Sequence, residues 1–153
     1  MNARLWTLSL VLAPLLGCGD DKEFWLPKND LLPMVALDDR VAFVERNSQT
    51  AFVLDPADPS LTPRQVQVGK APVLAVKRNG ANQLLVLGKG YRGSPDEPEI
   101  PAQLDVIDGA TPPAGGAPAA SYPLSGRYDA LAQSSDGRFL VLHHSPAGQT
   151  QAD

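Results

Sequence analysis

Two adjacent histidines and a short acidic stretch carry the side chains best suited to metal chemistry. His143 and His144 are the only histidines. They stand at the end of an expected strand, where neighbouring side chains point to opposite faces, so they are not expected to share one metal ion. Asp96, Glu97 and Glu99 lie among prolines and lack the Asp-x-Asp-x-Asp-Gly spacing of a calcium loop. The sequence therefore predicts no metal site and no cofactor.

Two further stretches could in principle do phosphate or nucleophilic chemistry. Gly88-Lys89-Gly90 follows an expected strand, but a phosphate-binding loop needs more glycines and a following helix. Ser134 and Ser135 flank an expected hairpin and have no base nearby in the sequence. We therefore predict no catalytic residue, and the sequence leans towards a protein that is not an enzyme.

The single cysteine, Cys18, follows an apolar run that begins just after Arg4. The run, residues 5–16, is shorter than the about 20 residues of a membrane-spanning helix and contains Pro14. It has the length of a signal-peptide core. A single thiol in an exported protein cannot form an internal disulfide and needs another explanation.

Lipid attachment is that explanation, because Leu15-Leu16-Gly17-Cys18 resembles the lipobox of bacterial lipoproteins. The resemblance implies cleavage between Gly17 and Cys18, a diacylglyceryl group on the Cys18 sulfur, and acylation of the new amino terminus. Residues 1–17 are then a signal peptide, and 18–33 a lipidated tether on the cell envelope. Gly19 after the cysteine, in place of aspartate, favours the outer membrane. An ordinary secretory signal with an incidental cysteine is the alternative.

The charge of the chain bears on its partners. The formal net charge is −4, and no basic cluster is present. A chain with this charge lacks the basic patch that proteins use to bind nucleic acid. The same balance also argues against a membrane attachment driven by charge. The membrane is therefore expected to be reached through the lipid, and a protein partner remains possible but unnamed.

The elements that are expected to position these residues are short β-strands, which recur in the same order along the chain. Asn79-Gly80 and Asp136-Gly137 each lie between two apolar runs, which predicts β-hairpins, because both central positions of a tight turn favour positive φ. In each copy a glycine, Gly69 or Gly126, stands eleven residues before the hairpin glycine. The flanking strands are expected at 72–76 with 84–87, and at 130–132 with 139–142.

Further strands complete the repeated unit. They are expected at 34–37, 41–44, 50–54, 65–68, 103–107 and 120–124, and Pro123 places the last at an edge. Four short antiparallel strands in each unit are typical of a propeller blade, and such units must stack to bury their faces. We therefore predict an all-β fold of four-stranded antiparallel β-propeller blades. About two and a half blades fall within residues 34–153.

The segments 41–55 and 66–72 resemble the YVTN-type β-propellers of bacterial surface and periplasmic proteins. They share a strand, an Asn-Ser turn, a strand ending in Asp, and a Val-Gly-x-x-Pro link. Phe43-Val44-Glu45-Arg46 replaces the signature tetrapeptide. The resemblance is structural and implies no ligand. Because propellers typically have four to eight blades, the chain is interpreted as a fragment, or as a module that closes by self-association.

Three functions remain open. The first is a lipid-anchored envelope protein whose blades bind or scaffold an unknown ligand. The second is a piece of a propeller enzyme, a lactonase or quinoprotein-like oxidoreductase, whose site lies in other blades. The third is a small stand-alone lipoprotein that uses its sheet to pair with a partner.

Overall fold

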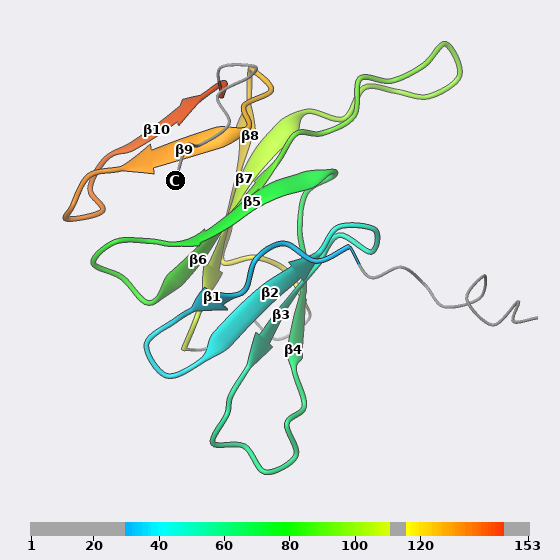
Figure 1. The fold of residues 1–153 in the computed structure, drawn as a ribbon. Coiled ribbons are helices and arrows are strands. Elements are labelled where there is room, and N and C mark those ends of the chain that lie inside the picture. Colours follow the sequence, from blue (N-terminus) through cyan, green and yellow to red (C-terminus); the bar gives the residue numbers. More distant parts are fainter. Residues whose placement is uncertain (1–29, 111–115, 146–153) are drawn as a thin grey trace, which may run out of the picture.

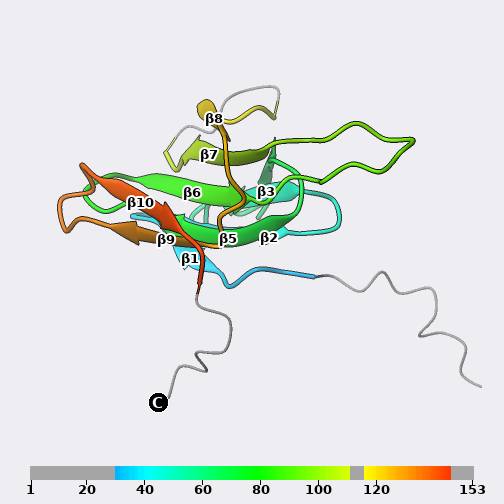
Figure 2. The ribbon, with the colours of Figure 1, turned by 90° about the horizontal axis from the view of Figure 1, so that it is seen from above.

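The computed structural model describes residues 30–110 and 116–145, which form three antiparallel sheets and no helix. No helix long and apolar enough to cross a membrane occurs in this part of the chain. Figure 1 shows the sheets one above another in chain order, and Figure 2 shows the same stack from above. The predicted all-β fold of antiparallel blades is confirmed.

The first blade has the strand order β1-β2-β3-β4. Its strands are β1 (Val35–Ala36), β2 (Val41–Glu45), β3 (Thr50–Leu54) and β4 (Arg64–Gln67). Along β2 the side chains alternate between buried and half-buried, because one face lies against the second blade. Ala42 and Val44 lie on that buried face, and Phe43 on the other.

The second blade repeats this arrangement with the order β5-β6-β7-β8. Its strands are β5 (Pro72–Lys77), β6 (Gln83–Gly88), β7 (Ala102–Asp108) and β8 (Ala120–Leu124). β6 is buried from Leu84 to Gly88 without alternation, which is expected of a strand covered on both faces. β8 contains Pro123 and is the edge strand, as the sequence predicts.

The third blade has two strands in the described part of the chain, β9 (Ala130–Gln133) and β10 (Leu140–His143). They pair from Leu140 with Gln133 to His143 with Ala130. Leu131 and Leu140 pack against the second blade. On the opposite face Val141 is exposed. The third blade is therefore half a blade here.

Two hydrophobic clusters hold the blades together. The larger one joins the first and second blades and contains Ala51, Val53 and Val66 together with Leu84, Val86 and Ile107. The smaller one lies on the other face of the second blade and contains Leu85, Leu104 and Val106, with Leu131 and Leu140 packed against them. Each blade thus buries its apolar face against its neighbour.

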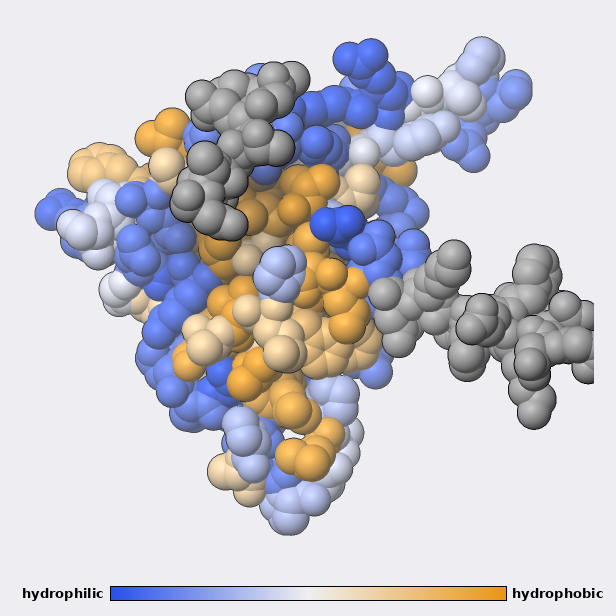
Figure 3. Space-filling view, in the orientation of Figure 1, coloured by the Kyte–Doolittle hydropathy of each residue, from blue (hydrophilic) through white to orange (hydrophobic). Residues whose placement is uncertain are grey.

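The outer face of the first blade is apolar and has no neighbouring sheet in the described residues. Phe43 and Phe52 stack on it, with ring centroids 5.0 Å apart. Met34 is 75% exposed. Figure 3 shows hydrophobic residues gathered in the middle of one side of the molecule, where Figure 1 places β1 and β2 together with β5 of the second blade.

The domain begins earlier than the sequence suggests. Leu31 forms a β-bridge with Glu45, and the Leu32 N–H donates to the Val44 carbonyl over 2.9 Å. Leu32 is buried in the larger cluster. Leu31 and Leu32 therefore belong to the first blade, although the sequence places them in the expected tether of 18–33. Residues 1–29, including Gly17 and Cys18, lie outside the described residues.

The predicted hairpin turns lie where expected, but their geometry differs from a two-residue turn. Gly80 and Gly137 have φ values of 68° and 66°. Among the described non-glycine residues, positive φ occurs at Gln49, Leu61 and Ala71. It does not occur at Asn79 or Asp136. The pairs Lys77–Leu84 and Gln133–Leu140 flank longer connections, 78–83 and 134–139.

These two connections pack against each other. The Asn79 side chain donates to the Ser134 carbonyl over 2.9 Å, and the Asn79 N–H donates to Gln133 Oε1, also over 2.9 Å. A Cβ atom on Gly137 would lie 1.8 Å from the Asn79 carbonyl oxygen. The glycines predicted from the repeat therefore serve close packing between blades as well as turn formation.

Candidate ligand-binding cavity

A cavity of ≈ 610 Å³ opens at the end of the first two blades that is opposite these hairpins. Three segments distant in sequence enclose it: the β2–β3 turn, the link between the blades, and the β6–β7 connection. Its lining residues are Arg46, Asn47, Gln49, Lys70, Ala71, Gly90, Tyr91, Glu97, Pro98 and Ile100. Its volume exceeds those of two other cavities in the described part of the chain, which are ≈ 450 and ≈ 60 Å³.

The β2–β3 turn is held by the carboxylate of Glu45. Glu45 accepts hydrogen bonds from the backbone N–H groups of Asn47, over 3.1 Å, and Ser48. The hydroxyl and N–H of Ser48 stabilise the ionised form and lower the pKa of Glu45 to about 2. Gln49 follows in the left-handed region, with φ 55°, which directs the turn towards the cavity.

The link between the blades is anchored by a buried carboxylate, Asp105 on β7. Its Oδ2 accepts the Gly69 N–H over 2.7 Å, and its Oδ1 accepts from Gln103 Nε2 and Ser121 Oγ, each over 2.6 Å. Asp105 is fully buried. Three donors to one carboxylate satisfy a group that would be costly to bury alone. This contact fixes the start of the segment that carries Lys70.

Lys70 and Ala71 are held by their backbone. The Gly90 N–H donates to the Lys70 carbonyl, and the Lys89 N–H to the Ala71 carbonyl, each over 3.0 Å. Ala71 has φ 50°. No ion pair of the Lys70 ammonium with another described residue occurs. A positive charge is therefore presented at the cavity on a fixed backbone.

The β6–β7 connection forms a ribbon that projects from the sheet (Figure 1). Tyr91 and Ile100 form a bridge with reciprocal backbone hydrogen bonds of 2.8 and 2.9 Å, and Ser94 and Glu97 form a second bridge. Gly90 begins the ribbon with φ 68°, and a Cβ there would lie 2.3 Å from the Ile100 carbonyl oxygen. Only glycine fits this close approach.

The cavity combines charged, amide and aromatic groups. Arg46 Nη1 lies 3.2 Å from Asp30 Oδ1, which orients the guanidinium. Tyr91 is 40% exposed and offers a ring face. Gln49 and Glu97 add an amide and a carboxylate. Such a set suits a small polar ligand that has both a flat or apolar part and hydrogen-bonding groups.

The predicted candidate residues are separated in the structure. His143 is exposed at the end of β10, and the His144 ring packs 5.6 Å from Tyr128. Glu97 lines the cavity, whereas Glu99 pairs with Arg127 at 3.6 Å. No group of three or more His, Cys, Asp or Glu that could hold a metal ion occurs among the described residues.

The glycine–lysine and serine stretches have structural contacts. Lys89 Nζ lies 3.5 Å from Asp129 Oδ2 and so joins the second blade to the third. The backbone hydrogen bond from the Ser145 N–H and the charge of Lys89 lower the pKa of Asp129. Ser134 Oγ donates to Asp136 Oδ1 over 2.7 Å within its own connection. That hydrogen bond lowers the pKa of Asp136.

No protein-family profile matches the chain, and no curated protein matches it significantly. The cavity residues were not predicted from the sequence as a group. Glu97 and Gly90 lie in the acidic and glycine–lysine stretches, Arg46 and Lys70 lie in the propeller-like segments 41–55 and 66–72, which imply no ligand, and Tyr91 belongs to no motif. Their only sequence signal is that the β6–β7 connection is longer than the β2–β3 turn.

Proposed function

We propose that this chain is a lipid-anchored protein of the bacterial cell envelope, held in the outer membrane, whose blade domain binds a ligand or scaffolds a partner. The lipobox-like Leu15-Leu16-Gly17-Cys18 supports the anchor. The observation that carries the binding role is the ≈ 610 Å³ cavity, because Arg46, Lys70 and Tyr91 converge on it from three segments that are distant in the sequence. The resemblance of residues 41–55 and 66–72 to YVTN-type propellers supports an envelope location.

The anchor is tested by Cys18→Ala in cells fed a labelled palmitate analogue. The wild-type chain is expected to take up label, to be cut before Cys18 and to fractionate with the outer membrane. Cys18→Ala should remain uncut and unlabelled. Ser48→Ala, which leaves the lipobox intact, is the control and should be processed normally. Normal cutting of Cys18→Ala would contradict the anchor.

The binding role is tested separately, with a set of small polar compounds followed by ligand-observed NMR. Compounds that bind the cavity should lose most of their binding in Tyr91→Ala and Lys70→Ala. Arg138→Ala alters an exposed cation on the third blade and is the matched control. Equal binding to all three variants would place the ligand elsewhere. The absence of any binding compound would count against the cavity.

A further inference from the structure

Two opposite charges at the cavity form no ion pair in the described part of the chain. Lys70 lines the cavity from the link between the blades, and Glu97 lines it from the ribbon between β6 and β7. Both residues are exposed. Neither pairs with the other or with another charged residue that the structure describes. The cavity therefore offers a cation from one wall and an anion from another.

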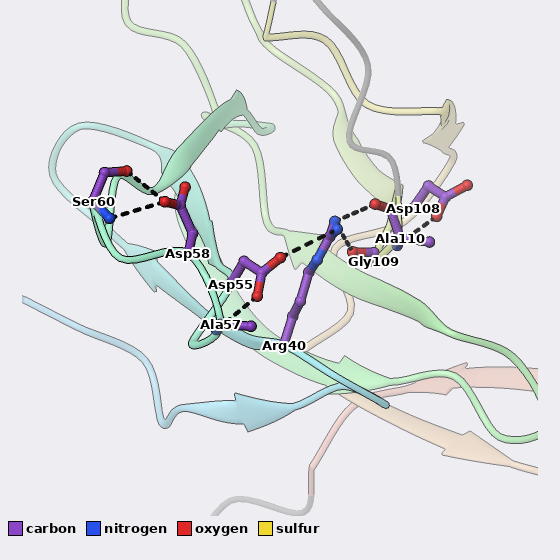
Figure 4. Close-up of polar contacts among 8 residues, drawn as sticks. All are labelled: Arg40, Asp55, Ala57, Asp58, Ser60, Asp108, Gly109 and Ala110. Atoms are coloured by element: carbon purple, nitrogen blue, oxygen red, sulfur yellow. Dashed lines mark hydrogen bonds and ion pairs between the residues drawn. The ribbon is translucent and has the colours of Figure 1, made fainter.

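A cation at the opposite end of the same two blades is used differently. There Arg40, directly before β2, lies 3.7 Å from Asp55 at the end of β3. Arg40 also donates to the carbonyls of Gly109, over 2.8 Å, and Ala110, at the end of β7 (Figure 4). Acceptors from both blades thus hold this cation, and it joins the two sheets. The two charged side chains of the cavity make no such contact with described residues, so the stacking of the blades does not account for them.

The other cation at the cavity already has a partner. Arg46 Nη1 lies 3.2 Å from Asp30 Oδ1 and 3.5 Å from Asp30 Oδ2. A phosphate or another multiply charged anion is commonly held by several cations, and among the described lining residues Lys70 is the one cation without a carboxylate partner. A ligand with one charge of each sign complements the cavity better, because Glu97 repels an anion and attracts an ammonium group.

The rest of the lining is largely apolar or uncharged. Tyr91, Pro98 and Ile100 line the cavity from the ribbon, and Ala71 lines it from the link. Tyr91 is 40% exposed, so its ring has surface that a ligand can cover. Burying an apolar side chain against this wall contributes affinity, and an aromatic one also stacks on the Tyr91 ring. Gln49 adds an amide, which suits hydrogen bonds to a peptide group.

We propose that the cavity binds a zwitterion of the amino-acid class, either a free amino acid or a short peptide, that carries an apolar or aromatic side chain. The ligand carboxylate contacts Lys70, its ammonium group contacts Glu97, and its side chain covers Tyr91. This inference rests on the proposed binding role of the cavity and names the chemical class of its ligand. It does not depend on the lipid anchor.

The first test is isothermal titration calorimetry of the full chain with phenylalanine, with the dipeptide phenylalanylalanine, and with blocked forms of each. Acetylation removes the ammonium charge, and amidation removes the carboxylate. Each blocked form is expected to bind about tenfold more weakly than its zwitterion, because one ionic contact is lost. Tighter binding of phenylalanine assigns the site to free amino acids, tighter binding of the dipeptide assigns it to short peptides, and either result supports the proposal.

The second test assigns each ligand charge to its residue. Lys70→Ala should weaken binding of the zwitterion about tenfold and should not weaken binding of the amidated form, which has no carboxylate. Glu97→Gln should weaken binding of the zwitterion about tenfold and should not weaken binding of the acetylated form. Arg92→Ala and Asp96→Asn alter charges on the same ribbon that do not line the cavity, and they are the matched controls. They should leave every affinity unchanged.

Several results would overturn the proposal, and they separate it from the proposed function. An acetylated form that binds as tightly as its zwitterion would assign the cavity to anions. Binding of other polar compounds through Tyr91 and Lys70, without binding of any zwitterion, would refute this inference and leave the proposed function standing, whereas failure of both sets of compounds would refute both. Binding of phenylalanine only after Phe24→Ser and Trp25→Ser would show that the chain's own segment occupies the cavity.

Discussion

The two faces of the second blade are built from the same strands but are covered to different extents. One face lies under a complete four-stranded sheet, and there Leu84, Val86 and Ile107 are all 0% exposed. The other lies under two strands, and a groove of ≈ 450 Å³, lined among others by Leu85 and Leu140, opens beside them. A blade therefore depends on its neighbours for its core, because no single sheet can bury both of its faces.

The polar groups differ between the faces as well. Asp105 shares the face of Val86 and ties the link between the first two blades to β7 through Gly69. The cluster on the other face is apolar, and the charges Arg78 and Arg138 stand at the end of the groove. A covered face can hold a buried carboxylate because every donor around it is fixed. The variants below test this contrast.

The largest expected effect comes from adjacent leucines on β6 that point to opposite faces. Leu84→Ala should lower the free energy of unfolding by about 3–4 kcal/mol, because its fully packed surroundings cannot collapse into the space. Leu85 is itself only 1% exposed, but it lines the groove, so Leu85→Ala should cost about 2 kcal/mol because side chains at the groove can relax into the space. Urea denaturation measures both. If Leu85→Ala cost as much as Leu84→Ala, the two faces would be equally packed.

The second effect concerns Asp105. Asp105→Leu should cost about 3 kcal/mol, since it leaves the Gly69 N–H and the side-chain donors of Gln103 and Ser121 without an acceptor. Asp105→Asn keeps one acceptor oxygen and should cost about half as much. Thermal unfolding of both variants measures the difference. A neutral or stabilising Asp105→Leu would show that the carboxylate does not hold the link.

The third effect compares two glycines with left-handed backbones. Gly137→Ala should cost about 2–3 kcal/mol, because the added Cβ would meet the Asn79 carbonyl oxygen. Gly116→Ala has a similar φ, 75°, but its nearest neighbour is 3.4 Å away, so about 1 kcal/mol is expected. The loss in Gly137→Ala should concentrate in β9 and β10 by hydrogen exchange. Equal losses would mean that the hairpin connections do not pack together.

The smallest effect is a dependence on pH at the cavity end. The pKa of Glu45 is lowered from 4.5 to about 2 by hydrogen bonds from Ser48, so its contribution to stability is present above pH 4.5. The contribution should be lost as the pH falls from 4.5 towards 2. Glu45→Gln should remove this part of the acid dependence, as measured by urea denaturation at several pH values. An unchanged acid profile would contradict the turn described here.

Much of the fold could be predicted because short apolar segments, turn glycines and prolines mark its strands and turns locally in the sequence. The strand predicted at 50–54 is observed as β3, and 120–124 as β8 with Pro123 at the edge. Gly80 and Gly137 mark real turns. The packing of Asn79 against Gly137 could not be predicted, because the two residues lie in the connections of different blades.

The cavity and the buried carboxylate of Asp105 could not be predicted either, because both depend on contacts between segments that are distant in the sequence. Arg46, Lys70 and Tyr91 come together only when the first two blades stack, and none carries a spacing motif. Asp105 sits between the apolar residues Leu104 and Val106, and its burial depends on the Gly69 N–H from the link between the blades. The place of Leu31 and Leu32 in the first blade could not be predicted, because they pair with residues of β2 that lie beyond β1 and the turn after it.

Native-state hydrogen exchange of the full chain compares the two faces of the second blade, since it reports the protection of each strand separately. If the second blade is fully covered on one face and half covered on the other, amides of β6 and β7 should exchange slowest, those of β2 and β3 next, and those of β9 and β10 fastest. Equal protection of β10 and β6 would contradict the account, because it would mean that the edge of β10 and the groove beside it are already covered.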